Sequence, residues 1–183
     1  MTEENESQAA AAGDEISQGQ FGIQKIYVKD ISFEVPDSPM VFQQEWSPSV
    51  NMDIANSATQ IGEGLFEAVL SVTITVSTDD KTMYLVEAQQ AGIFQVTGLP
   101  EDALNKLLSV SCPNILFPFV RELISDIVIR GGFPQLLLSP VNFEALYVQK
   151  MQQEAQQQGD GATHKARAHR ILQSRTCPQV KYW

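Results

Sequence analysis

The feature that most constrains this chain is the run "FEAVLSVTITV", Phe66 to Val76, in which apolar and polar residues alternate almost without interruption. A period of two places successive side chains on opposite faces of a β-strand, so one face of this strand is apolar. Shorter alternating runs occur in "YVKDISFEV", around Val50–Ile54 and in "MYLVEAQQAGIFQV". Short polar turns separate the runs, and the pattern predicts a four-stranded antiparallel sheet with one buried face.

After residue 98 the pattern changes from strand to helix. "LPEDALNKLLSVSC" opens with a proline and two acids, as helices often do, and Pro113 then interrupts the pattern. A longer helix is predicted at about 115–130, ending at Gly131–Gly132. Its apolar stripe is wider than one sheet face requires, which indicates a second apolar neighbour such as another subunit. A last helix begins near Asn142, a plausible cap. Strands followed by helices predict an α+β fold.

The charge divides the 183 residues into a folded body and two tails. Residues 1–20 are polar and acidic and predict a disordered tail, whereas residues 21–158 hold the predicted strands and helices. Residues 1–162 carry 7 Lys and Arg against all 22 acids, and residues 163–183 carry 5 Lys and Arg and no acid. Residues 159–183 therefore predict a flexible basic tail. The acidic body argues against nucleic-acid binding and favours a basic partner.

The sequence also bears on the cellular compartment. No uninterrupted apolar run reaches the length of a membrane span, and the N-terminus lacks the basic and then apolar pattern of a signal peptide. Two cysteines far apart in sequence make no disulfide framework. We therefore expect a cytoplasmic protein with no membrane span.

Patterns of catalysis and metal binding are missing from the sequence. Both histidines, His164 and His169, lie in the basic tail, and no phosphate-binding glycine loop or zinc-protease motif occurs. Cys112 precedes a predicted helix, where a reactive thiol is possible, but the body has no histidine to pair with it. A buried structural thiol is the favoured interpretation. We expect no enzyme activity, no metal and no cofactor; a small enzyme built on Cys112 is the alternative.

Two surfaces could bind other molecules. Asp30 and Glu34 share one face of a strand, and Glu87 lies in another strand, two residues after Leu85. This pattern fits either a solvated sheet face or an acidic docking surface. The segment "GGFPQLLLSPVNFEALYVQKM", Gly131–Met151, fits either the core or an apolar groove that binds extended peptide. From the pattern alone, the solvated face and the core are favoured.

Five segments carry a resemblance to a known family. "IQKIYVKDISFEVPDSP", "FQQEWSP", "VEAQQAGIF", "CPNILFPFVRELISDIVIRGGFPQL" and "SPVNFEALY" follow one another between about Ile23 and Gln157. In this order they resemble SecB, a family of bacterial protein-export chaperones. The resemblance implies a four-stranded antiparallel sheet with two helices, assembled as a homotetramer that is a dimer of dimers. It also implies an ATP-independent chaperone that keeps precursor proteins unfolded in the cytosol and delivers them to SecA.

The resemblance also implies sites for these partners. The positions that match the docking site for SecA are Asp30, Glu34, Leu85 and Glu87. Those that match the groove for unfolded precursors are Val50, Met52, Ile54, Phe133, Leu136, Leu137, Leu138, Phe143, Leu146 and Tyr147. Those expected in the oligomer interface are Val86, Ala88, Gln90, Phe119, Val120, Leu123, Ile124 and Ile127.

The C-terminus departs from the family pattern. "THKARAHRILQSRTCPQVKYW" is basic, whereas the family resembled here ends in a short polar or acidic tail. SecA contacts through the C-terminus are therefore not implied, and the tail could instead fold back on the acidic sheet. Two alternatives for the whole chain stay open: a general holdase that is not dedicated to export, and an oligomeric module that binds peptides.

Overall fold

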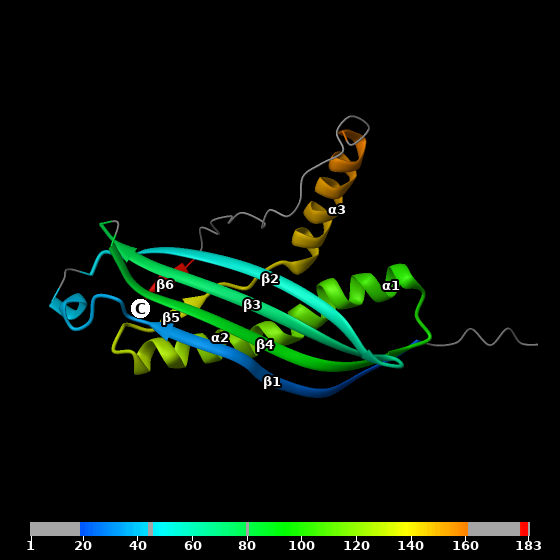
Figure 1. Cartoon of the computed structure of the whole chain (residues 1–183), viewed down its shortest axis with the longest axis horizontal. Coiled ribbons are helices and arrows are strands. Elements are labelled where there is room, and N and C mark those ends of the chain that lie inside the picture. The colour runs from blue at the N-terminus through cyan, green and yellow to red at the C-terminus, as the bar shows by residue number, and fades with distance from the viewer. Residues whose placement is uncertain (1–18, 44–45, 80, 161–179, 183) are drawn as a thin grey trace, which may run out of the picture.

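The computed structural model describes residues 19–43, 46–79, 81–160 and 180–182. Four strands form one antiparallel sheet in the order β1-β4-β3-β2, and a helical layer covers one of its faces (Figure 1). The elements in chain order are β1 (Gln20–Glu34), η1 (Met40–Gln43), β2 (Ser49–Gly62), β3 (Leu65–Thr78), β4 (Lys81–Thr97), α1 (Glu101–Lys106), η2 (Leu107–Ser111), α2 (Cys112–Arg130), β5 (Leu136–Leu138), α3 (Phe143–Asp160) and β6 (Val180–Tyr182). The α+β fold and the four antiparallel strands predicted from the sequence are confirmed.

The first connection differs from the expected short turn. β1 and β2 lie at opposite edges of the sheet, so the connection between them passes from one edge to the other; its described parts are residues 35–43, which include the 3-10 turn η1, and 46–48. Tight turns do join β2 to β3 and β3 to β4. The sequence could not give this order, because antiparallel pairing is decided by contacts between residues far apart in the chain.

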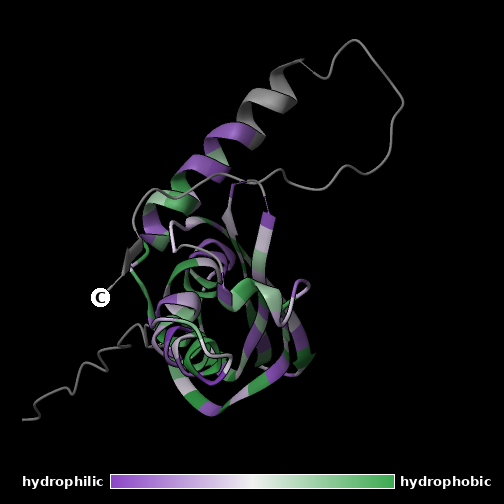
Figure 2. Cartoon of the chain, turned by 90° about the vertical axis from the view of Figure 1, so that its left-hand side faces the viewer, coloured by the Kyte–Doolittle hydropathy of each residue, from purple (hydrophilic) through white to green (hydrophobic). Residues whose placement is uncertain are grey.

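The core lies between the inner face of the sheet and α2. Alternate residues of β3 from Ala68 to Val76 are almost fully buried, as are Val120, Ile124 and Val128 on α2. In Figure 2 the sheet curves around the helical layer, and α3 leads away from the body. Apolar burial of this kind is the main stabilising contribution to a fold of this size.

The helical layer is more continuous than the sequence indicated. Pro113 does not interrupt it, since the chain stays helical from Glu101 to Arg130 through η2, which is one turn of π-helix. Pro113 directly follows this π-helical turn, where the regular ladder of α-helical hydrogen bonds is already altered, and the missing N–H of proline is accommodated there.

The end of α2 and the start of α3 follow the prediction. Gly132 has a positive φ of 86°, and the Phe133 amide donates to Val128 O at 3.2 Å, which ends α2. The Asn142 side chain caps α3 by accepting a hydrogen bond from the Ala145 amide at 3.0 Å.

The helical run Glu101–Arg130 is also the one place, among the residues described, with the length and apolar composition of a membrane span. The search of the sequence for an uninterrupted apolar run did not detect this helix, because polar and charged residues interrupt its apolar ones. Packing within the chain accounts for part of this apolar character, because 44% of the most apolar window is buried and α2 packs on β3 and β4.

Strand β1 contains two β-bulges, between Ile23 and Lys25 and between Val28 and Asp30. Its apolar residues Phe21, Ile23, Ile26, Val28, Ile31 and Phe33 are therefore spaced by two and three residues in turn, and all face the helical side. Because the bulge at Lys29 absorbs one residue, Asp30 lies opposite Gln89 on the outer face, whereas Val28 lies opposite Gln90 on the inner face.

Candidate functional site

The four predicted docking residues lie together on the outer face of the sheet. Glu34 is opposite Leu85 in the β1–β4 ladder, and the next outward position of β4, Glu87, is opposite Ser32. Asp30, Glu34 and Glu87 are exposed, and Leu85 is half-buried. The strands thus place Glu34 and Glu87 beside Leu85, and Asp30 lies further along β1, opposite Gln89. We call these four residues the acidic face.

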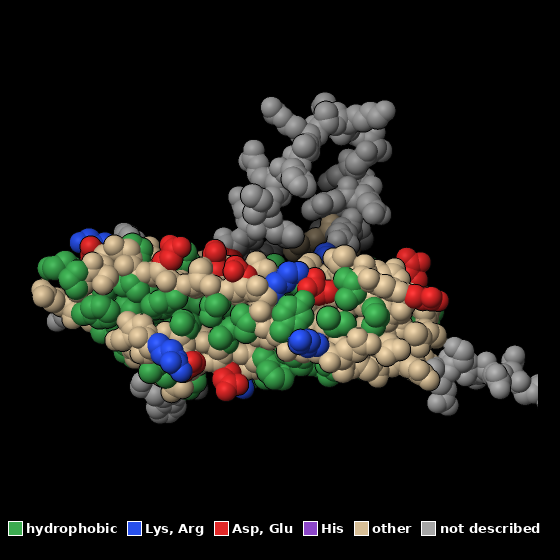
Figure 3. Space-filling model, turned by 60° about the horizontal axis from the view of Figure 1, so that its bottom comes forward, with side chains coloured by type: hydrophobic (Ala, Val, Ile, Leu, Met, Phe, Trp, Pro, Cys, Tyr) green, Lys and Arg blue, Asp and Glu red, His purple; other side chains and the backbone are tan. Residues whose placement is uncertain are grey.

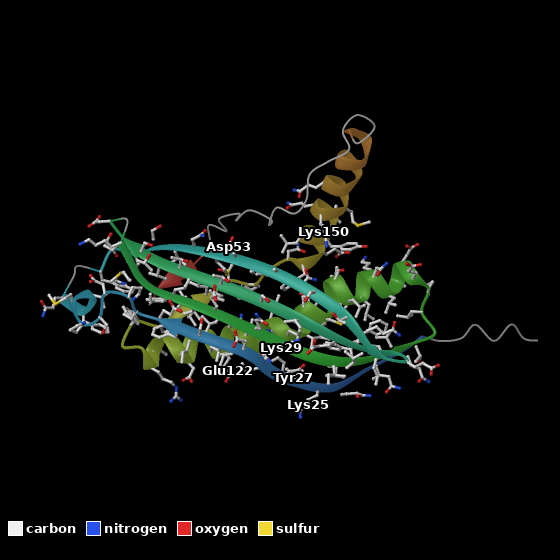
Figure 4. All side chains as sticks on the ribbon, in the orientation of Figure 1. Lys25, Tyr27, Lys29, Asp53, Glu122 and Lys150 are labelled. Carbon is white, nitrogen blue, oxygen red and sulfur yellow. The ribbon has the colours of Figure 1, made fainter. Side chains whose placement is uncertain are left out.

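A further carboxylate on the outer face was missed by the sequence analysis. Thr73 of β3 is opposite both Glu87 of β4 and Asp53 of β2, so Glu87 and Asp53 lie in one row across the outer face. Figure 4 labels Asp53 on β2, at the edge of the sheet opposite β1. Alternation around Val50–Ile54 places Asp53 on the face opposite Met52, but which residues lie beside Asp53 depends on strand order and register.

The acidic face ends at a group of paired side chains. Lys29 lies 2.7 Å from Glu67, which also accepts a hydrogen bond from the Tyr27 hydroxyl. The Lys29 ammonium lowers the pKa of Glu67, with a smaller contribution from Tyr27, and the same hydrogen bond raises the pKa of Tyr27. By contrast, no cation in the described part of the chain forms an ion pair with Asp30, Glu34 or Glu87. Their charge is available to a basic partner.

The predicted groove residues divide by exposure. The buried ones are Met52, Phe133, Leu136, Leu138 and Phe143; the half-buried ones are Val50, Ile54, Leu137 and Tyr147; and Leu146 is 45% exposed. Val50, Met52 and Ile54 point from β2 toward the helical side, and Phe143 packs edge-on against Phe117 of α2 at 5.9 Å. Half of the set therefore lies in the core, and the other half lies at its border.

A cluster of aromatic rings surrounds Phe133, which the sequence analysis did not connect to residues 36–48. The ring of Phe133 lies 4.6 Å from Tyr84, 5.2 Å from Phe42 and 6.0 Å from Trp46. Phe42 is 52% exposed and Trp46 37%, so the cluster reaches the surface. It does so where the connection between β1 and β2 passes the end of α2. An aromatic surface of this kind can bury apolar side chains of another polypeptide.

Most of the predicted interface residues are buried within the single chain, where α2 packs on β4. Val86, Ala88, Val120 and Ile124 are at most 1% exposed, Gln90 is 3% exposed, Leu123 and Ile127 are half-buried, and Phe119 is 44% exposed. Phe119 and Leu123 line an open groove of about 880 Å³ between β1 and α2, which we call the β1–α2 groove. Exposed apolar residues that the sequence analysis missed, Val28 and Ile129, line it as well.

Figure 3 looks onto this side of the molecule and shows a band of hydrophobic side chains along its length, with charged side chains at the borders. Gln90 lies inside the groove, where its amide nitrogen donates to Tyr27 O at 2.9 Å and its Oε1 has no hydrogen-bond partner among the described residues. A buried acceptor without a partner is costly, so a hydrogen-bond donor placed in the groove would stabilise Gln90.

Cys112 is fully buried at the start of α2. Burial raises the pKa of its thiol to about 12. No group of three or more His, Cys, Asp or Glu suited to a metal ion occurs within the described ranges. The local chemistry therefore offers a neutral thiol rather than a nucleophile.

We expect the Cys112 thiol to be inert in the folded protein. At pH 8 its alkylation by N-ethylmaleimide should be at least about a hundredfold slower than in the unfolded chain, because very little thiolate forms and the sulfur is covered. Mass spectrometry of the peptide that contains residue 112 measures the rate without interference from Cys177. Equal rates in folded and unfolded protein would contradict the burial of this side chain.

Known proteins resemble this chain over most of its length. The family model described as "Preprotein translocase subunit SecB" matches residues 14–154. The chain belongs to the SecB family.

Named SecB relatives agree with this assignment. The protein-export protein SecB of Methylococcus capsulatus is 56% identical over 144 residues, which cover 79% of this chain and 92% of the relative. That of Marinobacter nauticus is 44% identical over 164 residues, 90% of this chain and 99% of the relative. The resemblance stated from the sequence is confirmed, and the chain is a protein-export chaperone of the SecB family.

A solved structure supports the fold. The SecB-like chaperone of Mycobacterium tuberculosis, in complex with a ChAD peptide from the HigA1 antitoxin, superposes with a TM-score of 0.53 at 18% identity. The superposition covers 66% of this chain and 90% of the other. At this identity the likeness extends to the fold of the SecB family and no further.

Proposed function

We propose that this SecB family member is a cytosolic, ATP-independent homotetramer that holds unfolded precursor proteins and hands them to SecA. The observation that carries the proposal is the separation of two surfaces by one sheet. The acidic face lies outside β1 and β4, whereas the inward residues of β2 and the predicted groove residues lie on the helical side. A chaperone with this arrangement can hold a client and dock SecA at the same time.

Holding a client is proposed as passive burial of apolar segments. Apolar surface for a client is offered by Leu146 of α3, by half-buried Tyr147 and by the exposed edge of the aromatic cluster. The buried residues of the predicted groove belong to the hydrophobic core beneath this surface. Each contact is weak, but an unfolded chain presents many such segments and its contacts sum to a useful avidity. Folded proteins bury these segments and are not bound.

Docking of SecA is proposed on the acidic face. Asp30, Glu34 and Glu87 form no ion pair within the described residues, and together with the apolar Leu85 they suit a basic surface that also carries apolar side chains. The paired group of Lys29 and Glu67 beside it supplies no free carboxylate, so the attraction is strongest toward the Glu34 end of β1.

Assembly is proposed through the β1–α2 groove. Val28, Phe119 and Ile129 are each 44–49% exposed in the single chain, and Gln90 Oε1 finds no donor in the part of the chain that the structure describes. A second copy of the chain would cover the apolar band and could supply the missing hydrogen bond. This accounts for the apolar stripe of α2, which is wider than the sheet alone requires.

The direct test is suppression of aggregation of a slowly folding precursor, with no nucleotide present. We expect the chain to keep the precursor soluble and to release it when SecA is added. An oligomeric module without chaperone activity would leave aggregation unchanged. A general holdase would suppress aggregation but would not release the client to SecA.

Replacing Leu146 by Ser is expected to weaken binding of an unfolded precursor about three- to tenfold, since it removes apolar surface from the groove. Fluorescence anisotropy with a labelled precursor measures the affinity. Leu146 is preferred to Phe143, because Phe143 is only 4% exposed and its replacement would destabilise the fold itself. Val148→Ser is the matched control, since Val148 is 47% exposed and lies on a different side of α3. Equal effects of the two substitutions on precursor affinity would show that Leu146 is not part of the groove.

A further inference from the structure

The basic C-terminal segment contains a strand that pairs with the predicted client groove. β6 (Val180–Tyr182) runs antiparallel to β5 (Leu136–Leu138), with Leu136 opposite Tyr182 and Leu138 opposite Val180. The two strands lie side by side in Figure 1, apart from the four-stranded sheet. Within the residues that the structure describes, β5 has no other strand partner.

Strand β5 is held in a form that accepts an added strand. Pro134 and Pro140 flank it and favour extended backbone in the residues before them. Leu136 and Leu138 are 0% and 3% exposed, so alternate side chains fix the strand to the core. Its backbone N–H and C=O groups then need partners from another strand or from water, and such an edge is a template for pairing with extended polypeptide.

We propose that β6 is an internal competitor for unfolded clients: the chain's own C-terminal strand occupies the edge of β5 and has to be displaced before a client segment can pair there. The inference rests on the proposed function, because it assumes that clients use the groove of which β5 is part. It differs from the expectation that the tail would fold back on the acidic face, since the segment that pairs does so on β5.

The sequence of the tail suits this role. The segment "PQVKYW" combines apolar and aromatic residues with a lysine, and residues 163–183 contain no acid. Unfolded precursors expose segments of the same apolar and aromatic character, so tail and client compete with similar chemistry. The net charge of −15 on residues 1–162 attracts the five positive charges of residues 163–183 and favours retention of the tail near the body.

The effect on clients follows from the covalent connection. Residues 161–179 join α3 to β6, so the strand is present at an effective concentration on the order of millimolar. Three paired residues form a weak contact, but it is always available. A client with one segment binds only the fraction of molecules whose β5 edge is free, whereas a long client with several segments displaces β6. The tail would therefore select for long unfolded chains.

The experiment compares four forms of the full assembly: the complete chain, a chain that ends at Asp160, Lys181→Pro and Lys165→Pro. Proline at 181 removes a backbone donor from β6, and proline at 165 removes the same charge outside β6. Anisotropy titrations with a labelled single-segment extended peptide measure client affinity. Hydrogen exchange of the amides of 136–138 measures the β5–β6 pairing without any client.

We expect the chain that ends at Asp160 and the Lys181→Pro variant to bind the peptide about three- to tenfold more tightly than the complete chain, with faster exchange at β5. The Lys165→Pro variant should match the complete chain. Faster exchange with unchanged peptide affinity would overturn the competition although the strands pair, and unchanged exchange would overturn the pairing. If no form binds the peptide, the assignment of the groove is wrong and the proposed competition is wrong with it. The exchange data would still show whether β6 pairs with β5.

Discussion

Introducing charge into the β1–α2 groove is expected to break the assembly into smaller species. In the double variant Val28→Asp and Phe119→Asp, each subunit would place two carboxylates in the surface that another copy is proposed to cover. Val28 and Phe119 are 45% and 44% exposed in the single chain, so the variant can fold, whereas burial of an unpaired carboxylate costs several kcal/mol for each ion. Light scattering after size-exclusion chromatography should give a mass well below four times the 20.3 kDa of one chain.

The matched control is Ile61→Asp. Ile61 is an apolar residue of similar exposure, 51%, near the end of β2 and outside the groove, so its variant should keep the mass of the unmodified protein. Circular dichroism establishes that all variants are folded. A double variant that keeps the full mass would show that the groove is not the surface of assembly.

Removing charge from the acidic face is expected to weaken SecA binding at least about tenfold while client binding stays the same. Asp30→Ala with Glu87→Ala removes two of three carboxylates that have no cation partner in the described part of the chain. Loss of complementary charge slows association and reduces affinity, and it also reduces the dependence of binding on salt. Titration with SecA at two ionic strengths measures both effects, and anisotropy with a precursor measures client binding.

The control is Glu63→Ala with Glu101→Ala, which changes the net charge equally at exposed positions outside the acidic face. It should leave SecA affinity nearly unchanged. Equal loss of SecA and client binding in the Asp30 and Glu87 variant would show that the docking assignment is wrong.

Much of the secondary structure could be predicted because the signals are local. The alternation in β3, the glycines after α2 and the Asn142 cap each depend on a few neighbouring residues, and each occurs where the pattern placed it. The order of the strands could not be predicted, because residues 35–48 carry the chain across the sheet and nothing in their composition states which edge β2 joins.

The candidate site shows the same limit. Alternation placed Asp30, Glu34 and Glu87 on polar faces, but only the register brings Glu34 beside Leu85 and puts Asp53 in the row of Glu87. The aromatic cluster joins Phe42 and Trp46 to Tyr84 and Phe133, three segments that are far apart in the sequence. One signal was available and missed: the apolar spacing of β1, by two and three residues in turn, is what two bulges produce.

Those bulges determine where β1 tolerates a change of length. Gln24 and Lys29 are the residues that the ladder with β4 skips, so a variant that lacks either one can regularise the strand and leave every other side chain on its own side. A deletion between them, at Tyr27 for example, would instead shift the register of part of the strand by one residue. In that part, apolar side chains would move to the outer face of the sheet and charged side chains to the inner face. Length variation among natural relatives should therefore concentrate at positions 24 and 29.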